Sequence, residues 1–351
     1  MKKEVDRTRG GKLLGVLDGS VVSPPPVWFM RQAGRYLPEY GKVRAEAGGF
    51  VELCLDPKMA AEVTLQPVRR FDLDAAIIFS DILIVPYALG VPLWFEEGEG
   101  PRLEPVHDRH SFQLLHEVLD RAVTGRVYEA IAAVRAVLPP DTTLIGFCGA
   151  PWTVATYLIA GRGTEDQAPA KDLMRSDAKL FAEIIERLAD ATAEHLVGQL
   201  DAGADVVQIF DTWAGSLDAD SFLRWCVEPT VRIVSAVRRK KPGARVIVFP
   251  RGAGLDGIER LVAACGADAV SLDSQVDRRQ SRALLGGRCA LQGNLDPETL
   301  LRGGEKLDRA IDEMLRDFSG VRHIFNLGHG ILKETPIAHV ERMIARVRRS
   351  G

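Results

Sequence analysis

The stretch Asp205-Val-Val-Gln-Ile-Phe-Asp211 opens on an aspartate, runs through mostly apolar residues and closes on a second aspartate. Asp74-Ala-Ala-Ile-Ile-Phe-Ser-Asp81 and Asp268-Ala-Val-Ser-Leu-Asp273 share this design. A short apolar run without polar alternation is typical of a strand that is covered on both faces, as in a parallel sheet. The sequence therefore contains a weak internal repeat built on buried parallel strands.

The same kind of run recurs along the chain and alternates with amphipathic segments of helical length. The predicted strands are Val27–Met30, Ala75–Phe79, Thr143–Phe147, Val206–Phe210, Arg245–Phe249, Ala269–Leu272, Cys289–Gln292 and His323–Asn326. The clearest predicted helices are Leu180–Leu200, Asp220–Arg239, Leu255–Cys265, Pro297–Leu301, Asp308–Phe318 and Pro336–Arg348. Eight strand-then-helix units without a Pro- or Ser-rich linker predict an α/β protein, a single TIM-type (β/α)8 barrel over residues 1–351, with residues 1–12 as a loose extension. An open doubly wound sheet is the alternative.

Composition limits the classes of function. The chain has 351 residues, of which 46% are hydrophobic and 26% charged, and its net charge is −3. This composition excludes a disordered, collagen-like or coiled-coil chain. The near-neutral charge argues against broad binding to nucleic acid or to anionic membranes, although it is compatible with a local basic pocket.

Cysteine usage and hydropathy predict a cytoplasmic protein. Five cysteines without a C-x-x-C pair indicate neither a disulfide framework nor a zinc ribbon, and they favour a reducing compartment. The N-terminal residues are too charged for a signal peptide. Residues 142–161 lack charge, but Gly146, Gly149 and Pro151 predict a strand, a turn and a helix there instead of a membrane span.

Functional groups of a barrel gather where its strands end. Arg31 and Arg35 follow the first predicted strand, and their guanidinium groups suit carboxylates or phosphates unless they only form surface ion pairs. Asp81 stands before the charge-free Ile82–Phe95, either as a partly desolvated carboxylate or as a helix cap. His329 lies between two glycines, where an imidazole can bind a carboxylate or transfer protons.

The remaining strand ends offer neutral groups. Tyr157 and Thr212 carry hydroxyl groups that can bind a ligand, whereas Trp152 and Cys148 are predicted to pack in the core. Gly252–Gly257 matches G-x-G-x-x-G after a strand, but its mid-chain position favours a glycine-rich barrel loop over a dinucleotide site. The sequence has no recognisable metal-ligand spacing, P-loop or G-x-S-x-G motif, so neither a metal nor another cofactor is predicted.

Several of these segments together resemble the uroporphyrinogen decarboxylase family. The segments are Pro26-Val-Trp-Phe-Met-Arg-Gln-Ala-Gly-Arg-Tyr-Leu-Pro-Glu-Tyr40, Phe79-Ser-Asp-Ile82, Gly146-Phe-Cys-Gly-Ala-Pro-Trp-Thr-Val-Ala-Thr-Tyr157, Phe210-Asp-Thr-Trp-Ala-Gly215 and Asn326-Leu-Gly-His-Gly330. The similarity runs from about residue 13 to residue 348. It implies a distorted (β/α)8 barrel that acts as a homodimer without a cofactor and converts the four acetate side chains of uroporphyrinogen to methyls, giving coproporphyrinogen and carbon dioxide.

The resemblance also implies roles for individual residues. Asp81 would accept hydrogen bonds from the pyrrole N–H groups and stabilise the cationic transition state, while Arg31 and Arg35 orient carboxylates. Either Arg31 or His329 is a candidate proton donor, alongside water. The full expected substrate-binding set is Arg31, Gln32, Ala33, Gly34, Arg35, Phe50, Asp81, Tyr157, Thr212 and His329.

Three other functions are compatible with parts of the sequence. A corrinoid-linked methyltransferase of related fold needs zinc-bound thiolate chemistry, and the missing His-x-Cys pattern counts against it. A nicotinamide-dependent oxidoreductase would rest on Gly252–Gly257 alone. A tetrapyrrole carrier would bind the same substrate without releasing carbon dioxide.

Overall fold

A computed structural model describes residues 10–96 and 100–349. Within them, one parallel sheet has the order β1-β4-β5-β6-β7-β8-β9, so every strand pairs with its neighbours along the chain. Its strands are β1 (Ala75–Ile77), β4 (Thr143–Gly149), β5 (Val206–Asp211), β6 (Arg245–Pro250), β7 (Ala269–Ser271), β8 (Ala290–Gln292) and β9 (His323–Ile324). A separate antiparallel hairpin pairs β2 (Leu93–Glu96) with β3 (Gly100–Leu103).

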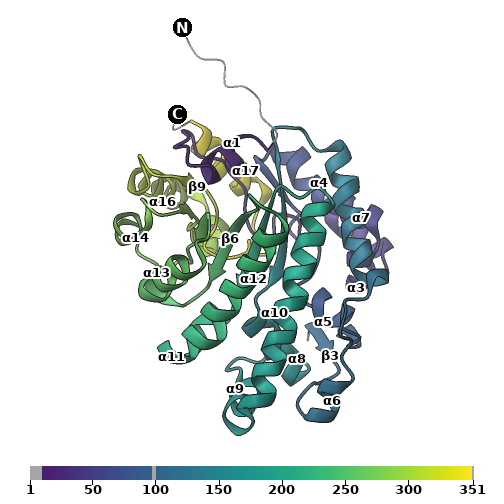
Figure 1. Cartoon of the computed structure of the whole chain (residues 1–351). Coiled ribbons are helices and arrows are strands. Elements are labelled where there is room, and N and C mark those ends of the chain that lie inside the picture. The colour runs from purple at the N-terminus through teal and green to yellow at the C-terminus, as the bar shows by residue number, and fades with distance from the viewer. Residues whose placement is uncertain (1–9, 97–99, 350–351) are drawn as a thin grey trace.

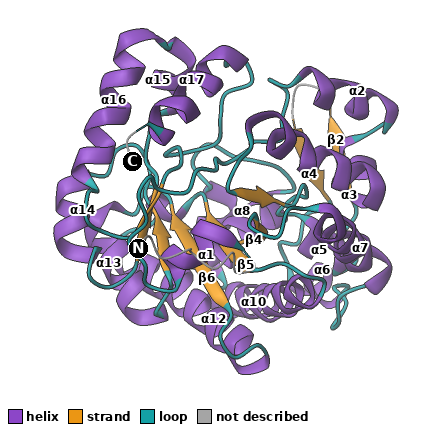
Figure 2. Cartoon of the chain, turned by 90° about the horizontal axis from the view of Figure 1, so that it is seen from above, coloured by secondary structure: helices purple, strands orange, loops and turns teal. Residues whose placement is uncertain are grey.

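Helices pack around the outside of the sheet, except that α1 (Gly11–Leu17) covers the amino ends of its strands (Figures 1 and 2). The other helices are α2 (Pro38–Glu46), α3 (Phe50–Leu55), α4 (Pro57–Phe71), α5 (Ile84–Ala88), α6 (Arg109–Gln113), α7 (Arg121–Val137), α8 (Pro151–Ala160), α9 (Ala168–Ser176), α10 (Ala178–Asp201), α11 (Ala219–Phe222), α12 (Glu228–Lys240), α13 (Gly254–Cys265), α14 (Arg278–Leu285), α15 (Pro297–Arg302), α16 (Gly304–Asp317) and α17 (Ile337–Arg348). A π-helical turn, Leu223–Val227, joins α11 to α12.

The sheet is closed by the segment that was predicted as the first strand. Val27 pairs in parallel with Phe325, which donates its N–H to the carbonyl of Pro26 at 2.9 Å. On the other side, Asp74 donates its N–H to the carbonyl of Val27 at 3.1 Å. The segment therefore lies between β9 and β1, and the prediction of a single distorted (β/α)8 barrel is confirmed.

That closing segment is a bridge and not a regular strand, so the prediction of a strand at Val27–Met30 was wrong in detail. Pro24, Pro25 and Pro26 precede it and have no N–H to donate to a ladder. Arg31 follows it with φ 62°, which ends the extended conformation. Only the residues between these two breaks remain available for pairing.

The aspartates that open the repeated strands join each strand to the one before it. Asp74 accepts the N–H of Val27 at 2.8 Å, Asp205 that of Leu144 at 2.8 Å, and Asp268 that of Val246 at 2.7 Å. The repeat detected in the sequence thus has a structural meaning at the amino ends of the strands. The aspartates that close the strands lie at the opposite, carboxyl ends, where barrels carry their function.

The inside of the barrel is packed in layers. At the amino end of the strands, a buried cluster contains inward-facing residues such as Ile145, Val206 and Ile247, and Leu13 and Val16 of α1 pack against it. Above it lie polar side chains, with the amide nitrogen of Gln292 donating to Gln208 at 3.2 Å and to Ser271 at 2.9 Å. A cavity opens above these layers, at the carboxyl ends.

Two further expectations are resolved by the described residues. The charge-free residues 142–161 form β4 followed by α8, as predicted, and no helix in the described part of the chain is long and apolar enough to cross a membrane. Gly11 and Lys12, assigned to a loose extension, instead begin α1, because the N–H of Gly10 is bound by the carbonyl of Pro140 at 2.7 Å. The rest of the predicted extension, residues 1–9, lies outside the described residues.

Candidate active site

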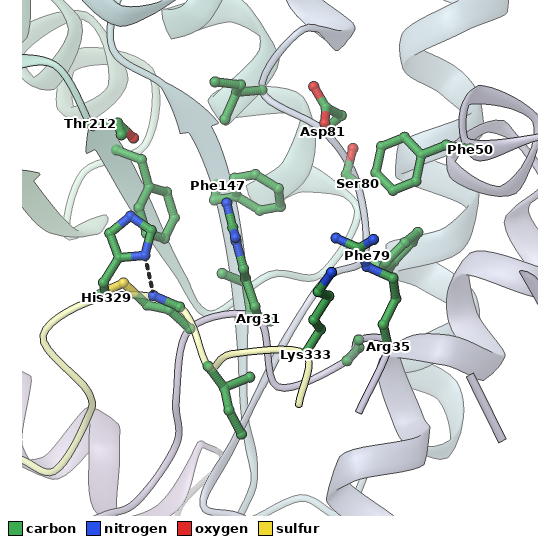
Figure 3. Close-up of a pocket in the computed structure, with 18 of the residues that line it drawn as sticks. Arg31, Arg35, Phe50, Phe79, Ser80, Asp81, Phe147, Thr212, His329 and Lys333 are labelled. Atoms are coloured by element: carbon green, nitrogen blue, oxygen red, sulfur yellow. Dashed lines mark hydrogen bonds between the residues drawn. The ribbon is translucent and has the colours of Figure 1, made fainter. Parts of the chain in front are cut away.

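A cavity of about 720 Å³ lies at the carboxyl ends of the strands (Figure 3). Its inner surface is aromatic and aliphatic, formed by the inward-facing Ile77, Phe147, Phe210 and Phe249. The loops that follow Met30, β1, β5 and β9, together with helix α8, contribute polar groups, including Arg31, Arg35, Ser80, Asp81, Tyr157, Thr212, His329 and Lys333. The cavity therefore places a few charges on a mostly apolar lining.

The two arginines come from one loop whose backbone is held from behind. Arg31 and Arg35, predicted from the strand end, line the cavity together with Ala33 and Gly34, which the family resemblance implied. Gln32 is fully buried and does not line it; its amide nitrogen donates to the carbonyl of Ala75 at 3.1 Å. Its own carbonyl accepts the hydroxyl of Tyr36 at 2.8 Å. Gln32 therefore positions the loop. Its side chain points away from the cavity, so it is not placed for the predicted contact with substrate.

Arg31 passes close to the loop that follows β9. A Cβ atom at Gly330 would lie 2.4 Å from Cδ of Arg31 and 2.8 Å from its Cγ. Real Cβ atoms do not approach carbon so closely, so the side chain of Arg31 takes this path because residue 330 is glycine. In the described part of the chain neither Arg31 nor Arg35 forms an ion pair, which leaves both guanidinium groups for a ligand.

Asp81 follows β1 and is an acidic group that lies with these arginines in the cavity. One carboxylate oxygen accepts the N–H of Leu83 at 2.8 Å, so Asp81 also holds the turn that leads to α5. Burial raises the pKa of the Asp81 carboxyl above its usual value, an effect opposed by the Leu83 N–H and by Arg31. Asp81 is therefore a cavity carboxylate, and the alternative of a helix cap was wrong, because the N-cap position of α5 is Leu83 and no side chain caps that helix.

Tyr157 of α8 and Thr212 after β5 contribute hydroxyl groups. Burial raises the pKa of Tyr157, so its phenol remains a hydrogen-bond donor at neutral pH. Behind Thr212, the buried Asp211 accepts the hydroxyl of Thr153 at 2.6 Å, and Thr153 accepts the N–H of Trp213 at 3.1 Å. Burial raises the pKa of Asp211 to about 6. This network fixes the backbone on both sides of Thr212.

His329 enters the cavity as a neutral imidazole. Its Nδ1 accepts the N–H of Gly330 at 2.6 Å, the bond drawn dashed in Figure 3. Burial, with Arg251 and Arg31 nearby, lowers the pKa of His329 to about 4. With Nδ1 occupied as an acceptor, the proton resides on Nε2, and this arrangement suits a hydrogen-bond donor better than a cationic acid.

Phe50 lines one wall of the cavity, as expected. Its ring lies 5.8 Å from that of Phe79 and 4.6 Å from that of Phe95 in the hairpin. The first pair is edge-on and the second is tilted, and an aromatic wall of this kind suits a flat, apolar ligand.

Sequence reasoning missed other lining residues, among them Ser80, Lys333 and the aromatic floor. Ser80 has a buried hydroxyl without a hydrogen-bond partner in the described residues, and only its place next to Asp81 pointed to it. Lys333 follows His329 by four residues in the same loop, but its place at the cavity depends on a turn that no sequence pattern predicted. Phe147, Phe210 and Phe249 are the last residues of three predicted strands, and this shared position was the sequence feature that could have identified them.

Features suggesting other chemistry have structural roles. The N–H of Gly252, which a bound phosphate would need, is donated to Asp273 at 2.8 Å. Trp152 is buried, and its indole nitrogen donates to the carbonyl of Trp213 at 3.0 Å. Cys148 is buried, and burial raises the pKa of its thiol, so it is not an activated nucleophile. Among the described residues, no group of three or more His, Cys, Asp or Glu side chains is placed to hold a metal ion.

Comparison with known proteins gives the same family over almost the whole chain. Residues 8–350 match the family described as Uroporphyrinogen decarboxylase (URO-D). A protein of Brucella anthropi named uroporphyrinogen decarboxylase is 51% identical over 339 residues, which cover 96% of this chain and 98% of that protein. A protein of Sphingopyxis alaskensis with the same name is 50% identical over 337 residues, with the same coverage.

The solved structures support the fold. A methyltransferase from Methanosarcina mazei superposes with a TM-score of 0.77 at 22% identity, covering 97% of this chain and 99% of that one. At this identity the likeness extends to the fold alone. The family match over residues 8–350 and the relatives that are about 50% identical show that the chain belongs to the uroporphyrinogen decarboxylase family.

Proposed function

We propose that the chain decarboxylates uroporphyrinogen, converting its four acetate side chains to methyls and giving coproporphyrinogen and carbon dioxide. The observation that carries this proposal is a carboxylate, Asp81, in an aromatic-lined cavity that also holds Arg31 and Arg35, which form no ion pair with any described residue. A tetrapyrrole with many carboxylates needs this combination, since its rings are apolar and its periphery anionic. The family relationship selects this substrate among other apolar polyanions.

The reaction needs an electron sink, and the pyrrole ring supplies it. Protonation of a ring carbon makes the pyrrole cationic; the bond between the acetate methylene and its carboxylate then breaks, and its electron pair enters the ring as carbon dioxide leaves. A proton adds to the methylene and the ring carbon returns its own, so each step consumes one proton and releases one carbon dioxide. No metal or other cofactor is required in this scheme.

Asp81 is assigned to the cationic ring. Its carboxylate accepts hydrogen bonds from pyrrole N–H groups through the oxygen that Leu83 leaves open, and its charge stabilises the cation as it forms. The rise in its pKa on burial supports this role, because it reflects poor solvation of an anion that a cationic ring would compensate. Preorganised charge of this kind contributes about 3–4 kcal/mol to other transition states.

The cationic and neutral groups are assigned to binding. Arg31 and Arg35 orient carboxylates, and Tyr157, Thr212 and His329 donate hydrogen bonds to the substrate, with Phe50 against the macrocycle. We assign His329 to binding and not to proton delivery, because a group with a pKa of about 4 is deprotonated at neutral pH. The backbone of Ala33 and Gly34 approaches the same ligand.

We further propose that the protein works in the cytoplasm as a homodimer. The family resemblance supports the dimer, and the buried, unpaired cysteines are compatible with a reducing compartment. Sedimentation of the purified chain distinguishes a dimer from a monomer of 38.4 kDa.

An anaerobic assay with uroporphyrinogen tests the proposed activity. The expected result is four successive losses of carbon dioxide, with the partly decarboxylated intermediates resolved by chromatography. Binding without release of carbon dioxide would instead favour a tetrapyrrole carrier. Turnover that depends on added NADH would revive the oxidoreductase alternative, which the Gly252–Asp273 hydrogen bond disfavours.

A further inference from the structure

Lys333 and Glu334 occupy the two central positions of a turn at the edge of the cavity. The N–H of Thr335 donates to the carbonyl of Leu332 at 3.1 Å and closes this turn. Both side chains line the cavity, yet 57% of the Lys333 side chain and 60% of the Glu334 side chain are exposed. These charges therefore lie at the mouth of the cavity and not on its floor.

The turn is attached to the arginine loop. The N–H of Ile331 donates to the carbonyl of Met30 at 3.0 Å, one residue before Arg31. Figure 3 shows Lys333 reaching from the loop after β9 into the cavity into which Arg31 and Arg35 also point. Two loops that are far apart in the sequence thus bring three cationic groups to one space.

This gathering of positive charge is only partly compensated within the described part of the chain, by Asp81 in the cavity and by the exposed Glu334. Neither Arg31 nor Arg35 has an ion pair there, and the ammonium group of Lys333 lies 3.4 Å from the carboxylate of Glu334, both well exposed. An exposed pair of this kind contributes little, about 0–1 kcal/mol, and exchanges readily for another anion. Three like charges around one cavity also repel one another until an anion enters.

We propose that Lys333 is a specificity-determining residue whose ammonium group binds a substrate carboxylate at the mouth of the cavity, in competition with Glu334. The proposal rests on the proposed function, because it takes the macrocycle as ligand. The carboxylate belongs to a ring other than the reacting one, since the reacting ring must reach Asp81. A flexible lysine suits this place, because the bound carboxylate shifts as successive rings turn toward Asp81.

Opposite charge changes on adjacent residues of the turn test the proposal. Lys333→Gln should raise KM for uroporphyrinogen about twofold to fivefold and leave kcat unchanged, the range for one exposed ion pair. Glu334→Gln should lower KM, because it removes the competing carboxylate. The control is Lys306→Gln on α16, an exposed lysine that does not line the cavity and changes the net charge equally. Raising the ionic strength should increase KM less steeply in Lys333→Gln than in the unsubstituted protein.

The possible results separate the two proposals. An unchanged KM in Lys333→Gln, relative to Lys306→Gln, overturns the role of Lys333 while the decarboxylase activity stands. A higher KM in both Lys333→Gln and Glu334→Gln also overturns it, because that points to damage to the turn and not to charge. If the unsubstituted protein releases no carbon dioxide, the proposed function fails, and the Lys333 inference fails with it.

Discussion

Replacing Gly330 with alanine tests how the path of the Arg31 side chain is set. The added methyl group would lie 2.4 Å from Cδ, 2.8 Å from Cγ and 3.0 Å from Nε of Arg31. Contacts this short force one partner to move. The backbone of Arg31 is held in a left-handed conformation at φ 62°, so the side chain must change rotamer and its guanidinium group must leave its position.

The size of the effect follows from what the guanidinium group binds. A hydrogen bond to a charged group contributes about 1.5–3 kcal/mol. Losing it from the transition state should lower kcat/KM about 10- to 150-fold. Gly330 does not adopt a positive φ, so alanine itself fits the backbone, and the melting temperature should change little.

The assay compares kcat/KM for uroporphyrinogen in the unsubstituted protein and four variants. Gly125→Ala on α7 is the matched control, because its added methyl group meets nothing within 4 Å. Arg31→Ala removes the atoms with which the methyl group collides, so the double variant Arg31→Ala/Gly330→Ala should be no slower than Arg31→Ala alone. Activity of Gly330→Ala within twofold of the unsubstituted protein would refute the reasoning, as would fully additive losses in the double variant.

Two pH measurements follow from the buried carboxyls and the histidine. The kcat/KM profile should fall on the acid side as Asp81 takes up a proton, and it should do so at a higher pH than for an ordinary aspartate, because burial raises the pKa of Asp81. The variant His329→Gln should keep this acid-side fall. Its disappearance would mean that His329 titrates in the working range despite a pKa of about 4. The pKa of Asp211, raised to about 6, means that the folded state holds this proton more tightly than the unfolded chain. From pH 8 to pH 5 the free energy of unfolding of the unsubstituted protein should therefore rise, relative to Asp211→Asn, by on the order of 1 kcal/mol in urea titrations; a constant difference would show that Asp211 does not titrate in this range.

The barrel was predictable because its strands are buried on both faces and keep their apolar runs. Three of the strands begin with an aspartate, which makes a repeat that is visible in the sequence. The carboxylates of these aspartates accept backbone N–H groups of the neighbouring strand or segment at its amino end. The closing segment at Val27 was harder, since prolines and the turn at Arg31 limit it to a single bridge. The hairpin of β2 and β3 was not predicted, because each of its strands has only four residues and Leu93–Phe95 belong to a longer charge-free stretch without polar alternation.

The site was predictable where charge stands at a strand end. Arg31, Asp81 and His329 could be named because barrels place function there, and the structure brings them into one cavity. Gln32 shares their motif but turns away, because its buried amide is used to hold the backbone. Lys333 was not predicted, because its position depends on a turn next to the hydrogen bond between Ile331 and Met30. These two residues lie about 300 positions apart, and a local sequence pattern does not encode such a contact.

In the proposed mechanism the Asp81 carboxylate stabilises a cationic pyrrole, and the variant Asp81→Asn removes that negative charge. Asparagine keeps an oxygen to accept the Leu83 N–H, so the melting temperature should not fall, and relief of the buried charge favours a small rise. Release of carbon dioxide from uroporphyrinogen in anaerobic single-turnover experiments should slow about 100- to 1,000-fold, while the substrate still binds. Near-normal release by a correctly folded Asp81→Asn protein would contradict the account.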